Sequence, residues 1–194
     1  GKRAGYLTTD VDACVLIGYN AGAANMTSAA DRTVAIGHSA LKVLTSGAEN
    51  VAIGYQAGLT LADGGYSTLL GYQAGASITS GSNNVAIGWK AMDAIQTGGR
   101  NTAVGANALG ALNTTNTEAY NVAFGQNAGS SITSGTYNTI IGSASDPSAV
   151  GGTNQTVVGY DTTGQANNSV TLGNANVTAV YMAQDSGATV HCGD

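Results

Sequence analysis

Residues 50–58 read NVAIGYQAG, residues 67–75 read STLLGYQAG, and residues 84–92 read NVAIGWKAM. The three segments start 17 residues apart, so the sequence repeats with a fixed period. A period of this size is typical of solenoid proteins, in which each repeat is one coil that buries its apolar residues against its neighbours. The repeat therefore decides the fold class before any single motif is interpreted.

The glycine that ends each apolar run marks ten copies of the repeat. Successive intervals between these glycines are 19, 17, 17, 17, 17, 20, 17, 17 and 14 residues. We therefore expect an N-terminal connector at 1–11, a repeat array of about ten coils at 12–175, and a terminating or transition segment at 176–194. The repeat glycines, which we expect to be structural, are Gly18, Gly37, Gly54, Gly71, Gly88, Gly105, Gly125, Gly142, Gly159 and Gly173.

The apolar run before each glycine has the composition of a β-strand. Val51 and Ile53 share one face of the expected strand and Ala52 lies on the other, because side chains alternate along a strand. β-Branched residues dominate the run, which favours a strand over a helix. All three positions are apolar, so we expect both faces to be buried, one inside the coil and one against a second layer, most simply another copy of the chain. The sequence therefore predicts an all-β solenoid or β-roll of about ten short coils.

The segment after the glycine also follows a pattern. Alanine almost always stands three residues after the glycine, as at Ala57, which indicates a closely packed backbone. The next residue is either glycine, as at Gly58, or large and apolar, as at Leu41. This difference indicates two subtypes of repeat.

Asparagine stands four residues before the glycine in half of the repeats. Coils in such a stack lie about 4.8 Å apart, so equivalent side-chain amides can hydrogen-bond along the stack as a ladder. We interpret this rank as a structural ladder, and a polar binding strip is the alternative. Its members are Asn50, Asn84, Asn101, Asn121 and Asn138.

Composition excludes several classes of function. The net charge is −5, which gives no electrostatic basis for binding nucleic acid. No apolar stretch reaches the roughly 18 residues of a membrane helix, so we expect no membrane insertion. Cys14 and Cys192 stand near opposite ends of the expected stack, too far apart for a disulfide within one chain.

The sequence contains little that indicates enzyme chemistry. The 11 acidic residues are scattered without a recurrent pair, whereas glycoside hydrolysis needs two placed carboxylates. Two histidines and two cysteines do not make a metal cluster or a nucleophile triad. We therefore expect no catalytic residue, no metal and no cofactor. A glycan depolymerase stays open as an alternative, because an oligomer can bring acids from different chains together.

Aromatic residues directly follow the glycine in several consecutive repeats. One interpretation is a platform on which sugar rings stack, which makes these side chains candidate contacts for a receptor or glycan. The other interpretation is that the rings stack on each other or cover a joint between subunits. The candidates are Tyr19, Tyr55, Tyr72 and Trp89, with His38 in the same rank.

The phrases NVAIG, NTAVG and NVAFG resemble the head repeats of YadA-like trimeric autotransporter adhesins. The longer phrase NVAIGYQAG, together with TSGSNN, resembles the repeat arrays of bacteriophage tail fibres. The closing stretch YMAQDSGATVHCGD resembles the transition before a C-terminal trimerising or self-cleaving chaperone domain in such fibres. Most repeats here are longer than those of the adhesin heads, so each coil needs a larger loop.

The resemblance implies a parallel homotrimer on the virion surface, a structural and adhesive tail-fibre segment that spaces or presents a host-receptor-binding tip. Its partners would be two further copies of the chain, adjoining fibre or virion segments, and a host cell-surface glycan or protein. One alternative is the head of a trimeric adhesin on a bacterial surface. Two further alternatives from other classes are the glycan depolymerase and an ice-binding solenoid.

Overall fold

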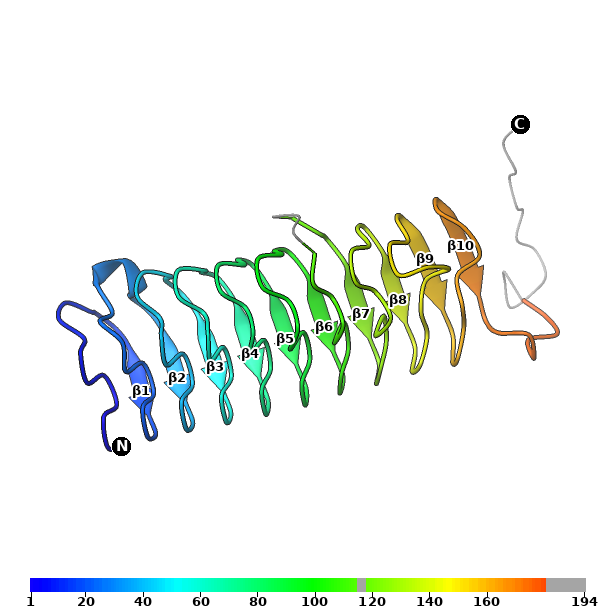
Figure 1. Ribbon diagram of the computed structural model, residues 1–194. Helices are drawn as coiled ribbons and strands as arrows, with labels where there is room; N and C mark the ends of the chain where they lie inside the picture. The colour runs from blue at the N-terminus through cyan, green and yellow to red at the C-terminus, as the bar shows by residue number, and fades with distance from the viewer. Residues whose placement is uncertain (115–117, 181–194) are drawn as a thin grey trace, which may run out of the picture.

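The computed structural model of the chain describes residues 1–114 and 118–180. One short strand per repeat pairs in parallel with the next, so that ten strands form a single sheet in chain order (Figure 1). The predicted all-β solenoid is therefore confirmed. The strands are β1 (Val15–Ile17), β2 (Val34–Ile36), β3 (Val51–Ile53), β4 (Thr68–Leu70), β5 (Val85–Ile87), β6 (Thr102–Val104), β7 (Val122–Phe124), β8 (Thr139–Ile141), β9 (Gln155–Val158) and β10 (Ser169–Leu172). A single 3₁₀ turn, η1 (Ser28–Ala30), and no α-helix occur in the described ranges.

The register of the sheet aligns equivalent positions of the repeat. Ile53 of β3, for example, pairs with Ile36 of β2 and with Leu70 of β4. Backbone hydrogen bonds between coils continue outside the strands: the Gln56 amide donates to the His38 carbonyl at 2.9 Å and the Gly58 amide donates to the Ala74 carbonyl at 3.0 Å. This pairing around the coil satisfies backbone groups that a three-residue strand alone would leave without partners.

The core is a column inside the stack. The middle residue of a strand points inward and is fully buried, as at Ala52 and Leu69, and residues such as Leu61 of the opposite wall meet it. Within one chain only the inner face of the strand is buried, and the expected burial of the outer face against another copy stays a prediction. Val51 and Ile53 point outward and keep part of their surface exposed, because the coil has only one interior.

The two repeat subtypes compensate for each other in volume. A Cβ atom at Gly58 would lie 2.7 Å from Cδ2 of Leu41 in the coil before and 2.8 Å from Cδ1 of Leu69 in the coil after. The glycine therefore leaves space for the leucines of its two neighbours. Large residues at this position, such as Leu41 and Met92, occur in coils whose strand points an alanine inward. Gly58 also belongs to such a coil, with Ala52, so the space at Gly58 is filled by the leucines of its neighbours.

The glycine after each strand is required by close contact between coils. Gly54 has φ +138°, and a Cβ there would lie 2.3 Å from the carbonyl oxygen of Gly71. The obstacle is backbone, which cannot rotate away, and this conformation is open to glycine almost alone. The column of repeat glycines is thus a line along which successive coils touch.

The first residues lie on the first coil. The Gly5 amide donates to the Ala21 carbonyl at 3.0 Å and the Thr9 amide donates to the Met26 carbonyl at 3.4 Å. Residues 1–9, expected to belong to a connector, thus make contacts like those between successive coils. The expected transition segment is described only over 176–180, so the closing stretch from Tyr181 and Cys192 lie outside the described residues.

Candidate functional site

The asparagine rank lies inside the stack at the entry to the strands. Asn84 illustrates its bonds: Oδ1 accepts the backbone N–H of Asn101 at 3.0 Å, and Nδ2 donates to the carbonyl of Gly98 at 2.9 Å. Direct amide-to-amide bonds join Asn101 to Asn84 and Asn138 to Asn121. All five predicted members are fully buried, so their side chains are not offered to a ligand: Asn50, Asn84, Asn101, Asn121 and Asn138.

The outer face of the sheet is an apolar strip that no other segment covers among residues 1–114 and 118–180. Two columns of side chains form it, from the first and third residues of β1 to β8 and from the second and fourth residues of β9 and β10. Ile17 is 54% exposed, Leu70 41% and Phe124 44%. Between them lie half-buried valines and isoleucines, with threonines at four positions of the first column, and the strip runs from β1 to β10. The threonines are Thr68, Thr102, Thr139 and Thr156.

The predicted aromatic rank runs along one edge of this strip, where the strands end. The rings of Tyr19, His38, Tyr55 and Tyr72 are stacked, with centroids 5.1 to 5.3 Å apart. Trp89, the next member, has the Lys90 ammonium 5.2 Å from its ring centroid.

The four predicted aromatic residues are 41 to 53% exposed, although the faces of the inner rings cover each other. A sugar ring that stacks on an aromatic side chain needs a free face. Within the stacked part, the rank therefore offers mainly ring edges and hydroxyl groups. This arrangement matches the interpretation in which the rings stack on each other, and leaves little room for a continuous stacking platform.

A second rank, which sequence reasoning missed, runs along the other edge, two residues before each of β1 to β8 and one residue before β9 and β10. We call it the turn column. Its members have left-handed backbones, with φ between +53° and +61°, a conformation that non-glycine residues adopt at a cost. In the sequence, the position could have been recognised as the residue just before each asparagine of the asparagine rank. Its members are Ala13, Arg32, Glu49, Tyr66, Asn83, Arg100, Tyr120, Tyr137, Asn154 and Asn168.

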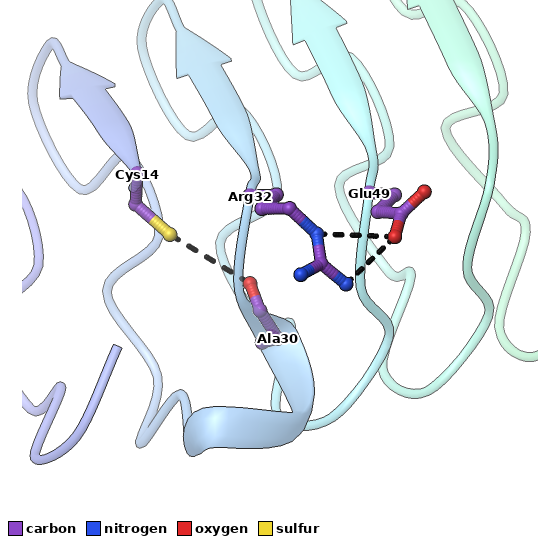
Figure 2. A network of polar contacts seen from close by, with 4 residues as sticks. All are labelled: Cys14, Ala30, Arg32 and Glu49. Atoms are coloured by element: carbon purple, nitrogen blue, oxygen red, sulfur yellow. Dashed lines mark hydrogen bonds and ion pairs between the residues drawn. The ribbon is translucent and has the colours of Figure 1, made fainter. Parts of the chain in front are cut away.

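Charged members of the turn column pair across coils. Figure 2 shows the Arg32 guanidinium reaching Glu49 of the next coil, with Nη2 2.7 Å from Oε1. Cys14, in the same region, is a free thiol whose Sγ lies 3.7 Å from the Ala30 carbonyl oxygen. Both members of the ion pair are exposed, so the contact fixes the turn more than it stabilises the fold.

A polar cluster in which an arginine and a tyrosine share one carboxylate lies at the longest repeat, beside β6 and β7. Arg100 Nε lies 2.8 Å from Oε1 of Glu118, and the Tyr120 hydroxyl donates to Oε2 of the same carboxylate. Tyr120 in turn stacks on Tyr137, with centroids 5.3 Å apart. The hydrogen bond from Tyr120, and then the nearby Arg100 charge, lower the pKa of Glu118. The same hydrogen bond raises the pKa of the Tyr120 phenol.

The described ranges also bear on two further kinds of site, a group of metal ligands and a membrane-spanning helix. Among residues 1–114 and 118–180, no three side chains of His, Cys, Asp or Glu are grouped so as to hold a metal ion. No helix in this part of the chain is long and apolar enough to cross a membrane. The expected lack of enzyme activity stays a prediction.

Comparisons with known proteins identify no relative of this chain, so its function is inferred from the arrangement of its side chains. A scan against protein-family models, a search of curated proteins and a search of solved structures each find no match to this chain. The function must therefore be argued from the apolar strip, the two ranks at its edges and the resemblance of the repeat.

Proposed function

We propose that this chain is a structural and adhesive segment of a homotrimeric bacteriophage tail fibre, which spaces or presents a host-receptor-binding tip on the virion surface. The observation that carries the proposal is the apolar strip on the outer face of the sheet. An exposed continuous apolar surface on a folded chain marks an interaction site. The repeat resemblance supports both the number of chains and the phage as owner.

The dimensions of the strip suit an interface between copies. Ten strands about 4.8 Å apart make it roughly 43 Å long, and three residues of about 3.3 Å make it roughly 10 Å wide. Covering these valines, isoleucines and leucines would stabilise an assembly by about 25 cal/mol for each Å² removed from water. The occupant we infer is the same strip of other copies, because only a chain with the same period presents matching side chains along the whole length.

Parallel, side-by-side association follows from the unlike edges of the strip. One edge carries the aromatic rank and the other carries the turn column. Copies related by an axis along the stack bring coil against equivalent coil, and a cyclic arrangement closes without leaving an open end. The ring edges of Tyr19, Tyr55, Tyr72 and Trp89 then lie beside the joint, where they either cover it or contact a glycan or protein of the host surface.

Durability outside a cell also supports a fibre. Only six lysines and arginines occur in 194 residues, which gives trypsin few sites. Backbone hydrogen bonds join successive coils both within the strands and outside them, so few segments can open locally. These properties are shared by the head of a bacterial adhesin, and the resemblance of NVAIGYQAG with TSGSNN is what favours the phage fibre.

Thiol labelling of the outer face tests the proposed joint. In a background with Cys14 and Cys192 changed to serine, Leu70→Cys places a thiol on the strip and Ser80→Cys places one in an exposed turn. We expect a maleimide to label the turn thiol at once and the strip thiol only after the assembly is dissociated. Equal rates in the native protein would mean that the strip faces water, and the proposed joint would be wrong.

A further inference from the structure

Two pairs of tyrosines are held in stacked contact between neighbouring coils. Tyr55 stacks on Tyr72 and Tyr120 stacks on Tyr137, each pair with centroids 5.3 Å apart and planes within 9° of parallel. The members of a pair are 17 residues apart, and the parallel register of the sheet holds their backbones about 4.8 Å apart. The rings are therefore fixed neighbours and do not depend on chance encounters.

The pair at Tyr120 has a proton acceptor that the other pair lacks among the described residues. Oε2 of Glu118 accepts the hydrogen bond from the Tyr120 hydroxyl, and Arg100 holds the same carboxylate through Oε1 at 2.8 Å. The Arg100 guanidinium also lies over the Tyr120 ring, with Cζ 5.6 Å from the centroid. Arg100, Glu118 and Tyr120 thus fix one another, and Tyr137, which is 56% exposed, covers the remaining side.

We propose that Tyr120 and Tyr137 are an oxidative cross-linking site, at which a haem peroxidase with hydrogen peroxide joins the two rings into dityrosine within one chain. The proposal rests on this side-chain cluster and does not depend on the number of chains in the assembly. A phenol that is hydrogen-bonded to a carboxylate can lose its proton as it loses an electron, because the base is already in position.

The reaction balances without any further reactant. Each phenol gives one electron to the activated peroxide and loses one proton, from Tyr120 to Glu118 Oε2 and from Tyr137 to water. The two phenoxyl radicals couple through a bond between the ring carbons adjacent to the C–O groups. The hydrogen on each coupled carbon then moves to the oxygen and restores the aromatic rings. One hydrogen peroxide takes up the two electrons and two protons and leaves as two water molecules.

The cross-link would tie the coil of β7 to the coil of β8. Between Gly105 and Gly125 the repeat is 20 residues long where most are 17, so the cross-link would lie next to the longest repeat of the stack. A covalent link between neighbouring coils restricts the unfolded chain, as a disulfide does. The stack would then resist opening at this position.

The test treats the full native chain with a haem peroxidase and hydrogen peroxide and follows dityrosine fluorescence. Peptide mapping with a protease that cuts between Tyr120 and Tyr137 then locates the link, which removes two hydrogen atoms from the joined peptides. We expect Tyr137→Phe to abolish this link and Glu118→Gln to slow it about tenfold or more. Tyr66→Phe, in the same turn column without a stacked ring partner among the described residues, should change nothing.

The link between Tyr55 and Tyr72 is the internal reference, because Glu118→Gln should leave its rate unchanged if the stack stays folded. Absence of the Tyr120–Tyr137 link in the native chain would overturn the site. Links found only between different chains would overturn the intrachain pairing. An unchanged rate in Glu118→Gln, measured against the reference pair, would overturn the role given to the carboxylate.

Discussion

Replacement of a buried asparagine gives the sharpest test of how the coils are held together. Asn84→Ala removes the acceptor of the Asn101 backbone N–H and the donor to the Gly98 carbonyl. The side-chain amide of Asn101 also loses its bond to Asn84 Oδ1 but keeps the Gly99 carbonyl as an acceptor, so two groups are left without a partner. Both lost partners belong to the interior of the stack, where Asn84 and Asn101 are fully buried, so water cannot readily replace them. Each buried group left without a partner costs about 1–3 kcal/mol.

The expected loss in the free energy of unfolding is therefore about 2–6 kcal/mol, from two such groups. This is a large part of the roughly 5–15 kcal/mol that folded domains possess. Asn84→Ser should lose about half as much, because a serine already occupies this rank at Ser67, where its Oγ accepts the Asn84 backbone N–H at 3.3 Å.

Urea unfolding followed by circular dichroism, at one fixed protein concentration, measures the change. The control is Asn113→Ala, since Asn113 is exposed, has no side-chain hydrogen bond among the described residues, and should change stability by no more than about 0.5 kcal/mol. If Asn84→Ala were as mild as this control, the ladder would not hold the coils together and the reasoning would be refuted.

Three further predictions concern the stack. Gly71→Ala should lower the free energy of unfolding by more than about 3 kcal/mol, because φ is +134° and the new Cβ would meet the Gly88 carbonyl oxygen at 2.4 Å. Gly151→Ala should be neutral, because its nearest neighbour is a side-chain hydroxyl at 3.2 Å, and thermal unfolding compares the two variants. Gly58→Ala should lower the free energy of unfolding by about 1–3 kcal/mol by crowding Leu41. In a double-mutant cycle, the variant that combines it with Leu41→Ala should be more stable than the sum of the two single losses predicts, and simple additivity would contradict the packing described. Because the pKa of Glu118 is lowered, its contribution to stability is present above the ordinary pKa of 4.5 and is lost as pH falls through the lowered value. Glu118→Gln should therefore flatten the acid part of a plot of melting temperature against pH. An unchanged acid part would count against the Arg100 and Tyr120 contacts.

The fold could be predicted because one constraint repeats ten times. Each copy of the run that includes Val51 and Ala52 carries the same strand pattern, and the interval of 17 fixes which residues become neighbours. The sequence could not show which face of each strand points into the coil. Both faces of the strand are apolar, so alternation alone does not say that Ala52 points inward and Val51 outward.

The site was harder to predict because its features are exceptions to the repeat. The stacked rings of the aromatic rank follow from the period, and sequence reasoning weighed that arrangement. The cluster at Glu118 depends on the longer interval before Gly125 and on left-handed residues such as Tyr120, neither of which has a hydrophobic pattern. The two repeat subtypes could be recognised in the sequence. That Gly58 leaves space for Leu41 could not be predicted, because this depends on atomic positions in neighbouring coils.

Sedimentation equilibrium of the unmodified chain tests the central claim, that the apolar strip on the sheet is an interface between copies. We expect a single species with three times the mass of one chain, unchanged over a wide range of protein concentration. Ile87→Arg, on the strip, should lower the mass, whereas Ser80→Arg in the exposed turn should not. A folded chain that sediments at the mass of one copy at every concentration would contradict the account.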